Sequence, residues 1–346
     1  MRNSKIYLGV IAILLCGFGV PRVSAQDIHF SQFSSSPLTL NPGATGAFNG
    51  KFRVAANIKD QWTAFDSPFK TRSLSFDMPF MEDIITDGSL AGGIHYVRDI
   101  AGDLDVGTNQ IGLSLAANKS LDRENNVSIG IQAGFAQWAI GGDGNTRRWD
   151  SEFDPSASGG YTNNGALEST IPLENFSYGD FSTGIFWRYM GNIQAHAGLA
   201  VYHVNRPSLS FLDSGEKLNS KLAFHGGAEI FVVDELVSVM PQLLFLKQGP
   251  QSEFNVGGLV KYRLKQPARY TGEIEETAVY LGGWYRVSDA FIVNARFDYK
   301  NFALGVSYDI NISDFDVATS KKGGLEFSLI FINPGESKRK TASPLM

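Results

Sequence analysis

One pattern recurs about fourteen times along the chain: a segment of roughly ten to fifteen residues in which apolar and polar side chains alternate. A period of two puts successive side chains on opposite faces of a β-strand. In residues 51–62 one face carries Phe52, Val54, Ala56 and Ile58, and the other carries Arg53, Asn57 and Lys59. In residues 71–80 one face carries Leu74, Phe76, Met78 and Phe80, and the other carries Ser73, Ser75 and Asp77. We find no window with a helical period, so the chain is predicted to be all-β.

The remaining strands are predicted from the same alternation. They cover residues 89–99, 105–119, 126–140, 176–190, 192–204, 218–233, 236–247, 252–265, 277–287, 289–299, 302–312 and 323–333. Pro241 cannot donate a ladder hydrogen bond and predicts a bulge in its strand. The last strand gathers Leu325, Phe327, Leu329 and Phe331 on one side, as is typical of the closing strand of outer-membrane barrels.

Loop lengths distinguish a soluble sandwich or propeller from a closed barrel in lipid. With the N-terminus in the periplasm, connections after odd-numbered strands face outward and the others are short inner turns. The longest connections, 141–175 and 205–217, then lie outside, and short links at 191, 234–235 and 300–301 lie inside. The links at 266–276 and at 288 depart from this rule, which casts doubt on a strand boundary there. We predict a transmembrane outer-membrane β-barrel of about 14 antiparallel strands over residues 51–333.

The first 25 residues have the three parts of a secretory signal peptide: basic Arg2 and Lys5, an apolar core at 6–20, and small residues at 23–25. The apolar run of 15 residues is short for a spanning helix, which disfavours the alternative of a membrane anchor. Cleavage is expected before Gln26. Lipidation at Cys16 is disfavoured because Leu15 precedes it.

Removal of this leader moves the formal net charge from −5 to −8, which disfavours nucleic-acid binding. Cys16 is the one cysteine of the sequence, so the mature protein is predicted to have no disulfide and no thiolate metal site. The mean hydropathy of −0.09 is compatible with a barrel, because lipid-facing and lumen-facing residues average out.

The start of the mature protein resembles the PorP/SprF family of outer-membrane proteins from the type IX secretion system and gliding machinery of Bacteroidetes. The residues that carry the resemblance are Asp27, His29, Phe30, Ser31, Gln32, Ser36–Pro37, Asn41–Gly46, Arg53 and Gln61–Trp62. The family usually has an aromatic residue before the Asn-Pro pair and an alanine after it, where this sequence has Leu40 and Gly43. The resemblance implies a barrel in the cell outer membrane that works with periplasmic and outer-membrane secretion proteins, or that holds a secreted adhesin at the cell surface.

Residues 26–50 form a polar segment ahead of the first strand, and residues 334–346 form a C-terminal tail. The segment is either an ordered plug in the barrel or a periplasmic tail. Asn41-Pro42, followed by Gly43 and Gly46, favours a fixed compact turn and hence the plug. The candidate plug or partner residues are Asp27, His29, Phe30, Gln32, Asn41, Pro42, Gly46 and Trp62.

The search for chemistry finds no catalytic motif and no cofactor site. The histidines His29, His95, His196, His203 and His225 are scattered without zinc spacing. One outer loop gathers oxygen ligands suited to calcium, at Asp143, Asn145, Asp150, Glu152 and Asp154. A solvated acidic loop is the alternative. Met240 and the aromatic residues Trp62, Trp138, Trp187 and Trp284 are interpreted as membrane-interface anchors.

Three function classes remain. A secretion or motility component that binds proteins is favoured by the N-terminal signature. A general or substrate-selective pore is the alternative, since a barrel of this size has a wide lumen unless it is plugged. An enzyme is disfavoured by the missing motifs.

Overall fold

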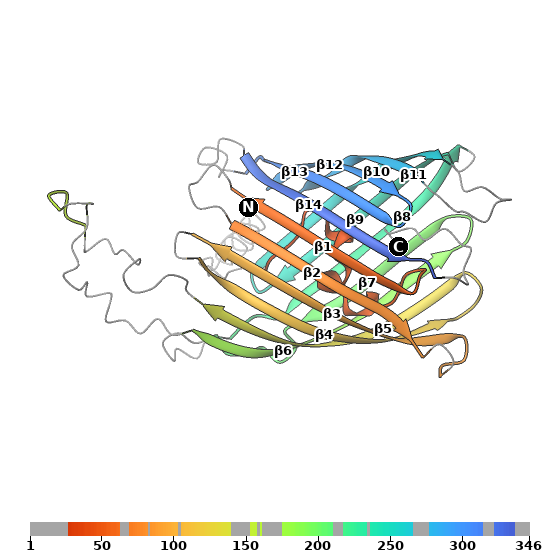
Figure 1. The fold of residues 1–346 in the computed structure, drawn as a ribbon, viewed down its shortest axis with the longest axis horizontal. Coiled ribbons are helices and arrows are strands. Elements are labelled where there is room, and N and C mark those ends of the chain that lie inside the picture. Colours follow the sequence, from red (N-terminus) through yellow and green to blue (C-terminus); the bar gives the residue numbers. More distant parts are fainter. Residues whose placement is uncertain are drawn as a thin grey trace, which may run out of the picture.

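The computed structural model is a closed barrel of fourteen antiparallel strands, counted over the residues that it describes. Each strand pairs with its neighbours in sequence, and β1 also pairs with β14 to close the ring (Figure 1). The described residues are 27–62, 69–81, 84–102, 105–139, 153–157, 160, 175–209, 217–233, 236–265, 277–313 and 322–335.

The strands are 9 to 15 residues long, which suits tilted membrane-spanning strands. They are β1 (Phe52–Gln61), β2 (Phe69–Phe80), β3 (Gly88–Ala101), β4 (Val106–Ser120), β5 (Asn125–Ala139), β6 (Phe176–Met190), β7 (Gln194–Tyr202), β8 (Lys221–Val233), β9 (Val237–Gln248), β10 (Gln251–Lys265), β11 (Thr277–Arg286), β12 (Ala290–Tyr299), β13 (Phe302–Asn311) and β14 (Lys322–Asn333).

The prediction of an all-β barrel is confirmed, and all fourteen predicted segments are strands. The bounds around the doubtful links hold to within one residue: β10 ends at Lys265 as predicted, and β12 begins at Ala290, one residue later than predicted. The short link there is a turn in which Ser288 has a positive φ of 60°. The long link 266–276 therefore lies at the end where short turns were expected, and the tight turn at Ser288 lies at the end where long loops were expected. All fourteen strands are nevertheless present.

Apolar side chains cover the outside of the barrel and polar side chains face the lumen. In β2, Leu74, Phe76 and Met78 are exposed, whereas Ser73, Ser75 and Asp77 are buried. The same exposure recurs around the ring at Leu113, Leu115, Ile129, Ile131, Phe181, Leu281, Val293 and Phe327. An exposed apolar band of this extent matches the lipid-facing surface of a membrane barrel.

The prediction of a β-bulge at Pro241 is wrong. Pro241 pairs with Gly258 of β10 in unbroken register. On the β8 side, the pairs that flank Pro241 are Gly227 with Gln242 and Ile230 with Val239. These two pairs have the same register, so no extra residue is inserted between them. Glycines on both neighbouring strands leave room for the proline, since a Cβ at Gly258 would lie 3.0 Å from Pro241 Cα. The register shift between β8 and β9 lies instead between Phe231 and Val233.

The two ends of the barrel differ in the length of their connections. We call the end reached after odd-numbered strands the long-loop end, because it includes the links between β5 and β6 and between β7 and β8. The opposite end, with the links 191–193 and 300–301, is the short-turn end. The Lys300–Asn301 link joins β12 and β13 directly, and Lys300 has a positive φ of 55° as such a turn needs.

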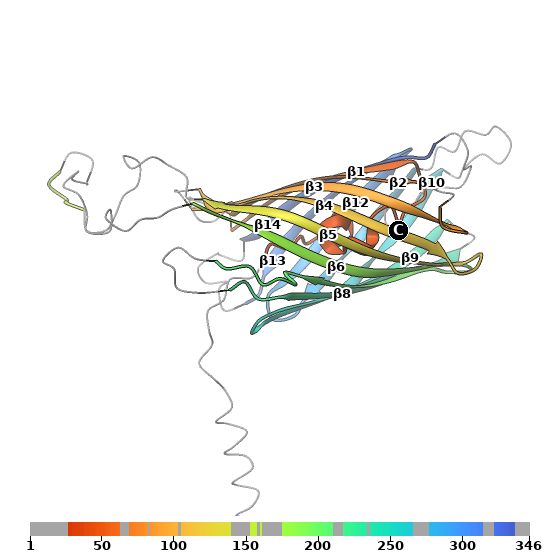
Figure 2. The ribbon, with the colours of Figure 1, turned by 90° about the horizontal axis from the view of Figure 1, so that it is seen from below.

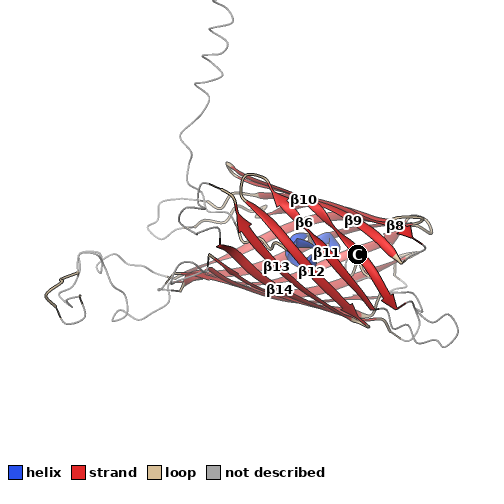
Figure 3. Ribbon diagram, turned by 90° about the horizontal axis from the view of Figure 1, so that it is seen from above, coloured by secondary structure: helices blue, strands red, loops and turns tan. Residues whose placement is uncertain are grey.

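Short helices occupy the lumen, where the sequence indicated no helical period. They are η1 (Phe33–Ser35), α2 (Pro37–Leu40) and η2 (Pro42–Ala44), and Figures 2 and 3 show them enclosed by the strands. Each spans about one turn, too short to produce a periodic pattern. No helix in the described ranges is long and apolar enough to cross a membrane.

Single cysteines test the orientation of the barrel. Ser156→Cys lies in the long β5–β6 link, and the matched Asn192→Cys lies in the β6–β7 turn. We expect a membrane-impermeant maleimide to label Cys at 156 on intact cells and Cys at 192 only after permeabilisation, because outer-membrane barrels place long loops outside. If Cys at 192 were labelled on intact cells and Cys at 156 only after permeabilisation, the barrel would have the opposite orientation.

Candidate functional site: the segment inside the barrel

Residues 27–50, here called the lumenal segment, run through the barrel from the long-loop end to the short-turn end. Asp27 contacts His203 just beyond β7, at the long-loop end. At the other end Lys51 N donates to Asn333 O, the last residue of β14, where β1 begins. Ser36 precedes the short helix α2, whose first residue is Pro37, a position where proline needs no amide hydrogen. The local sequence therefore breaks the segment into compact turns.

Asp27 is held by four polar contacts at the long-loop end. Its Oδ2 lies 2.6 Å from His203 Nε2 and 2.8 Å from Lys221 Nζ. Gln248 completes the set, accepting from Asp27 N at 2.9 Å and donating to Asp27 Oδ1 at 3.1 Å. Three different strand ends thus converge on the first described residue of the segment.

His203 lies between two carboxylates, with Nδ1 2.9 Å from Asp180 Oδ1 and Nε2 on Asp27. Burial alone would lower the pKa of the imidazole, but the hydrogen bonds to Asp180 and Asp27 outweigh it and raise the pKa to about 9. Burial would also raise the pKa of Asp27, but Lys221 and His203 outweigh it and hold that pKa below its ordinary value. At neutral pH the contact is therefore a charged one.

Glu326 of β14 binds the backbone of the segment. Its carboxylate accepts from Ser31 N at 2.7 Å and from Gln32 N at 3.1 Å. The Gln32 side chain in turn donates to Glu326 O at 3.1 Å and accepts from Ser328 Oγ at 2.8 Å. The side chain of Glu326 is fully buried, so these bonds replace the water that it would otherwise need.

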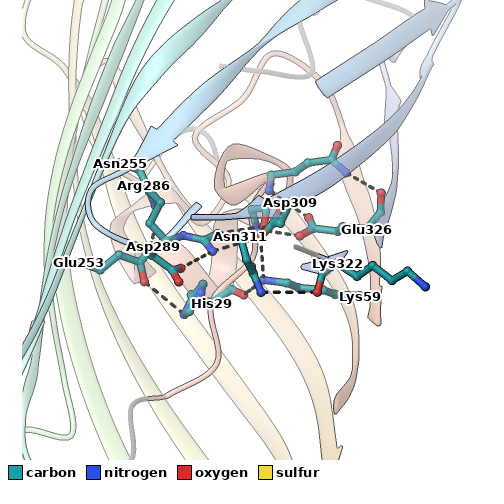
Figure 4. A network of polar contacts seen from close by, with 12 residues as sticks. His29, Lys59, Glu253, Asn255, Arg286, Asp289, Asp309, Asn311, Lys322 and Glu326 are labelled. Carbon is teal, nitrogen blue, oxygen red and sulfur yellow. Dashed lines mark hydrogen bonds and ion pairs between the residues drawn. The ribbon is translucent and has the colours of Figure 1, made fainter. Parts of the chain in front are cut away.

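Arg286 of β11 is the centre of the adjoining charge network (Figure 4). It contacts Asp289 at 3.0 Å, Asp309 at 3.1 Å and Glu253 at 3.5 Å, and it donates to Ser31 Oγ at 3.0 Å. The segment joins this network again at His29, whose Nδ1 lies 3.3 Å from Glu253 and whose carbonyl accepts from Lys59 Nζ at 3.2 Å. Burial, together with the charges of Lys59 and Arg286, lowers the pKa of His29.

An apolar contact fixes the next turn of the segment. The Phe33 ring packs edge-on against Trp284 with centroids 5.8 Å apart, in a buried cluster that includes Met240, Leu244 and Tyr280. Trp284 and Met240 are only 4% and 2% exposed. Their interpretation as membrane-interface anchors is wrong, because both face the lumen and pack on the segment or beneath it.

The Asn41-Pro42 turn fits against glycines of the wall. Asn41 Oδ1 accepts from Gly43 N at 2.8 Å, and Asn41 Nδ2 donates to Ile185 O at 3.0 Å. A Cβ at Gly184 of β6 would lie 2.1 Å from Asn41 Oδ1, and one at Gly130 of β5 would lie 2.2 Å from Pro42 O. These two glycines face each other across β5 and β6. The wall therefore lacks side chains where the turn sits.

The end of the segment is fixed by a buried ion pair. Arg53 of β1 contacts Asp77 of β2 at 2.7 Å and also donates to Ala44 O at 3.0 Å. Asp77 accepts from Gly46 N at 2.7 Å. Gly46 has a positive φ of 66°, and a Cβ there would collide with Ala91, so glycine is required on both counts. Gly43, by contrast, sits in η2 and needs no positive φ.

The comparisons with known proteins identify the family of this chain. The model of the type IX secretion system membrane protein PorP/SprF family matches residues 22–331, nearly the whole chain. The chain belongs to this family. With the closed barrel, the match places this PorP/SprF protein in the outer membrane. No curated protein matches the sequence.

Solved barrels are only distantly similar to this PorP/SprF protein. CdiB from Acinetobacter baumannii is 8% identical with a TM-score of 0.43, over 81% of this chain and 60% of that chain. The CymD monoaromatic hydrocarbon channel is 9% identical with a TM-score of 0.44, over 88% and 95%. The β domain of the Bordetella autotransporter BrkA is 12% identical with a TM-score of 0.37, over 82% and 99%. The family assignment rests on the sequence match alone.

The structure brings most of the predicted site residues together. Asp27, His29, Gln32, Asn41 and Gly46 all bind the wall as described above. Phe30 and Pro42 are also buried in the lumen. Trp62 is separate, at the end of β1 on the long-loop rim, where its ring meets Phe69 edge-on at 5.1 Å.

The calcium hypothesis stays a prediction. Asp143, Asn145, Asp150 and Glu152 lie outside the described residues. Asp154 accepts from the Ser156 hydroxyl at 2.5 Å and from the Ser156 backbone N–H at 2.8 Å, and these local turn contacts lower the pKa of its carboxyl. Within the described ranges, no group of three or more His, Cys, Asp or Glu is placed to hold a metal.

Sequence reasoning missed the partners in the wall. The lumen-facing charges Glu253, Arg286, Asp309 and Glu326 bind the segment, yet none was predicted, and His203 was considered only as a metal ligand. A signal was present for the strand residues: Asp309 and Glu326 fall on the polar face of their alternation, near the same end of the barrel. His203 lies beyond its strand and had no such signal.

A methyl group at one wall glycine should displace the lumenal segment. Gly184→Ala would place Cβ 2.1 Å from Asn41 Oδ1, whereas Gly179→Ala on the same strand meets nothing closer than Gly134 O at 4.0 Å. We expect chymotrypsin to cleave after Phe33 and Phe48 faster in Gly184→Ala than in the wild type, with the strands still resistant. Gly179→Ala should match the wild type. Equal protection of the segment in both variants would contradict this fit.

The His203 contact should weaken at alkaline pH. Its pKa in the folded protein is about 9, above the ordinary value of about 6.5. Its contribution is therefore complete below about pH 6.5 and is lost as the pH rises through about 9. Amide hydrogen exchange of residues 27–32, corrected for the intrinsic rate, should accelerate over this window. His203→Gln should remove the pH dependence and His95→Gln should keep it; a flat wild-type profile would refute the assignment.

Proposed function

We propose that this protein is a plugged barrel that serves type IX secretion by binding other proteins. Its partners are periplasmic components of the machinery, a secreted adhesin at the cell surface, or both. It is exported by a cleaved signal peptide and performs no catalysis. The observation that carries the proposal is the lumenal segment, which is bonded to the wall from one mouth of the barrel to the other.

The filled lumen favours a binding role over a general pore. A passive channel needs a continuous aqueous path, and barrels with more strands than this one provide it when they are open. Here the polar groups that would line such a path, including Glu326 and Arg286, are buried against residues 29–32. Solutes would have to displace the segment before they could pass.

In this proposal the expected orientation gives each mouth a role. With the long loops outside, the Asp27 contacts lie at the cell surface, where an adhesin would be held. The short-turn mouth, where residues 46–50 lie against β2 to β6, then faces the periplasmic machinery. The segment connects the two mouths, so a partner at either one touches the same element.

Replacement of Asn41-Pro42 by Ala-Ala should impair surface display of a client while barrel abundance stays nearly unchanged. The substitution removes the Asn41 bonds to Gly43 and Ile185, whereas the hydrogen-bonded strand ladder does not include this turn. Display is measured by antibody on intact cells, and abundance by immunoblot of outer membranes. Gly179→Ala is the control. Full display by the Ala-Ala variant would refute a functional role for the turn.

Conductance in planar bilayers separates the binding role from the pore. The wild-type protein should show no large steady conductance. Gly184→Ala, in which the segment is displaced, should conduct more than Gly179→Ala. A large open conductance in the wild type would favour the pore.

A further inference from the structure

A cavity of about 340 Å³ lies at the short-turn mouth, between the end of the lumenal segment and the wall. The segment contributes residues 46–50, and β2 to β6 contribute the remaining lining. The polar groups that face it include Asn118, Asn126 and Ser128, and the rings of Phe48 and Phe186 add apolar surface. A space of this size accommodates one or two side chains, not a folded domain.

Arg188 lines this cavity and has no partner in the part of the chain that the structure describes. It lies on β6 opposite Asn126 of β5 and His196 of β7. Among the described residues no hydrogen bond or ion pair is formed by its guanidinium. Other lumenal arginines differ: Arg53 pairs with Asp77 at 2.7 Å, and Arg296 pairs with Asp298 at 2.6 Å.

A second lining group is also unsatisfied. Ser128 is 3% exposed, and its Oγ lies buried without a hydrogen-bond partner. Buried polar groups in folded proteins are almost always bonded, and a charge without a counter-charge costs more than a neutral group. Ser128 and Arg188 both belong to the lining of this cavity, and an unbonded hydroxyl beside an unpaired guanidinium indicates a ligand with acceptor atoms.

We propose that this cavity binds a carboxylate group of a partner protein, supplied by an acidic residue or by the partner's C-terminus. One guanidinium forms a bidentate pair with one carboxylate, and Ser128 and the two asparagines add donors around it. The rest of the lining carries little net charge, because Lys119 and Asp87 offset each other. A phosphate dianion would call for several cations, whereas the Phe48 and Phe186 rings suit the methylene groups of an acidic residue.

The cavity couples its ligand to the lumenal segment. Residues 46–50 form one wall, and Gly46 is bonded to Asp77 beside the Arg53 pair. A bound carboxylate would hold this end of the segment against β6. That the partner is periplasmic rests on the proposed function and its orientation.

The site can be tested in the purified full-length barrel by asking whether a bound ligand slows the chemical modification of a single cysteine in the cavity. Ser120→Cys places the thiol in the cavity lining, and its reaction with a neutral methanethiosulfonate is timed. The probes are a capped Gly-Gly-Asp-Gly-Gly peptide, its Asn analogue and inorganic phosphate, at equal concentration. We expect the Asp peptide to slow the reaction at least about threefold, with no effect of the other two.

Added to the Ser120→Cys protein, Arg188→Gln should abolish this protection. Arg98→Gln, which removes the same charge from the exposed face of β3, should retain it. Equal protection by the Asn peptide, protection by phosphate as strong as that by the Asp peptide, or full protection in Arg188→Gln would each overturn the proposal.

Client display in cells distinguishes this site from the broader function. Arg188→Gln should reduce display several-fold at normal barrel abundance, whereas Arg98→Gln should not. If Arg188→Gln displays fully while the Asn41-Pro42 variant fails, the carboxylate site is refuted and the proposed function stands. If both variants display fully, both proposals fail.

Discussion

In a bilayer every backbone N–H and C=O of a spanning segment needs a partner inside the protein, and the pairing of β1 with β14 satisfies this constraint. Everything else follows from that closure. Fourteen strands enclose a lumen, and their alternation turns Arg53, Arg286 and Glu326 into it. Charged groups in such a space need water or partners. The lumenal segment provides partners for several of them, including Glu326 and Arg286.

The wall and the segment are fitted to each other in both chemistry and shape. Glu326 caps two backbone amides of the segment, and Asp27 is held by groups from three strand ends. Where the Asn41-Pro42 turn approaches most closely, the wall has Gly130 and Gly184 in place of larger residues. Such a fit gives the segment a fixed course, which a loosely held tail would not need.

Arg188, at the short-turn mouth, is a lumenal charge that has no charged partner among the described residues. Arg53 and Arg188 both face the lumen near that end, yet Arg53 pairs with Asp77 whereas Arg188 faces a cavity. A protein that binds machinery through one mouth needs unsatisfied groups there, and stability alone would favour satisfying them. Under the proposal above, the paired charges hold the segment, and Arg188, which is unpaired among the described residues, binds a partner.

The sequence by itself determined the strands, their faces and the barrel, because an alternation of period two is a local property that each segment carries alone. It also indicated the Asn41-Pro42 turn, since proline restricts its neighbour. It could not place His203, Glu253 or Arg188, because each acquires its role from strands far away in the sequence. Trp284 and Met240 show the same limit: an aromatic or apolar residue suits lipid and lumen equally, and only the closed register decided that these two face the segment.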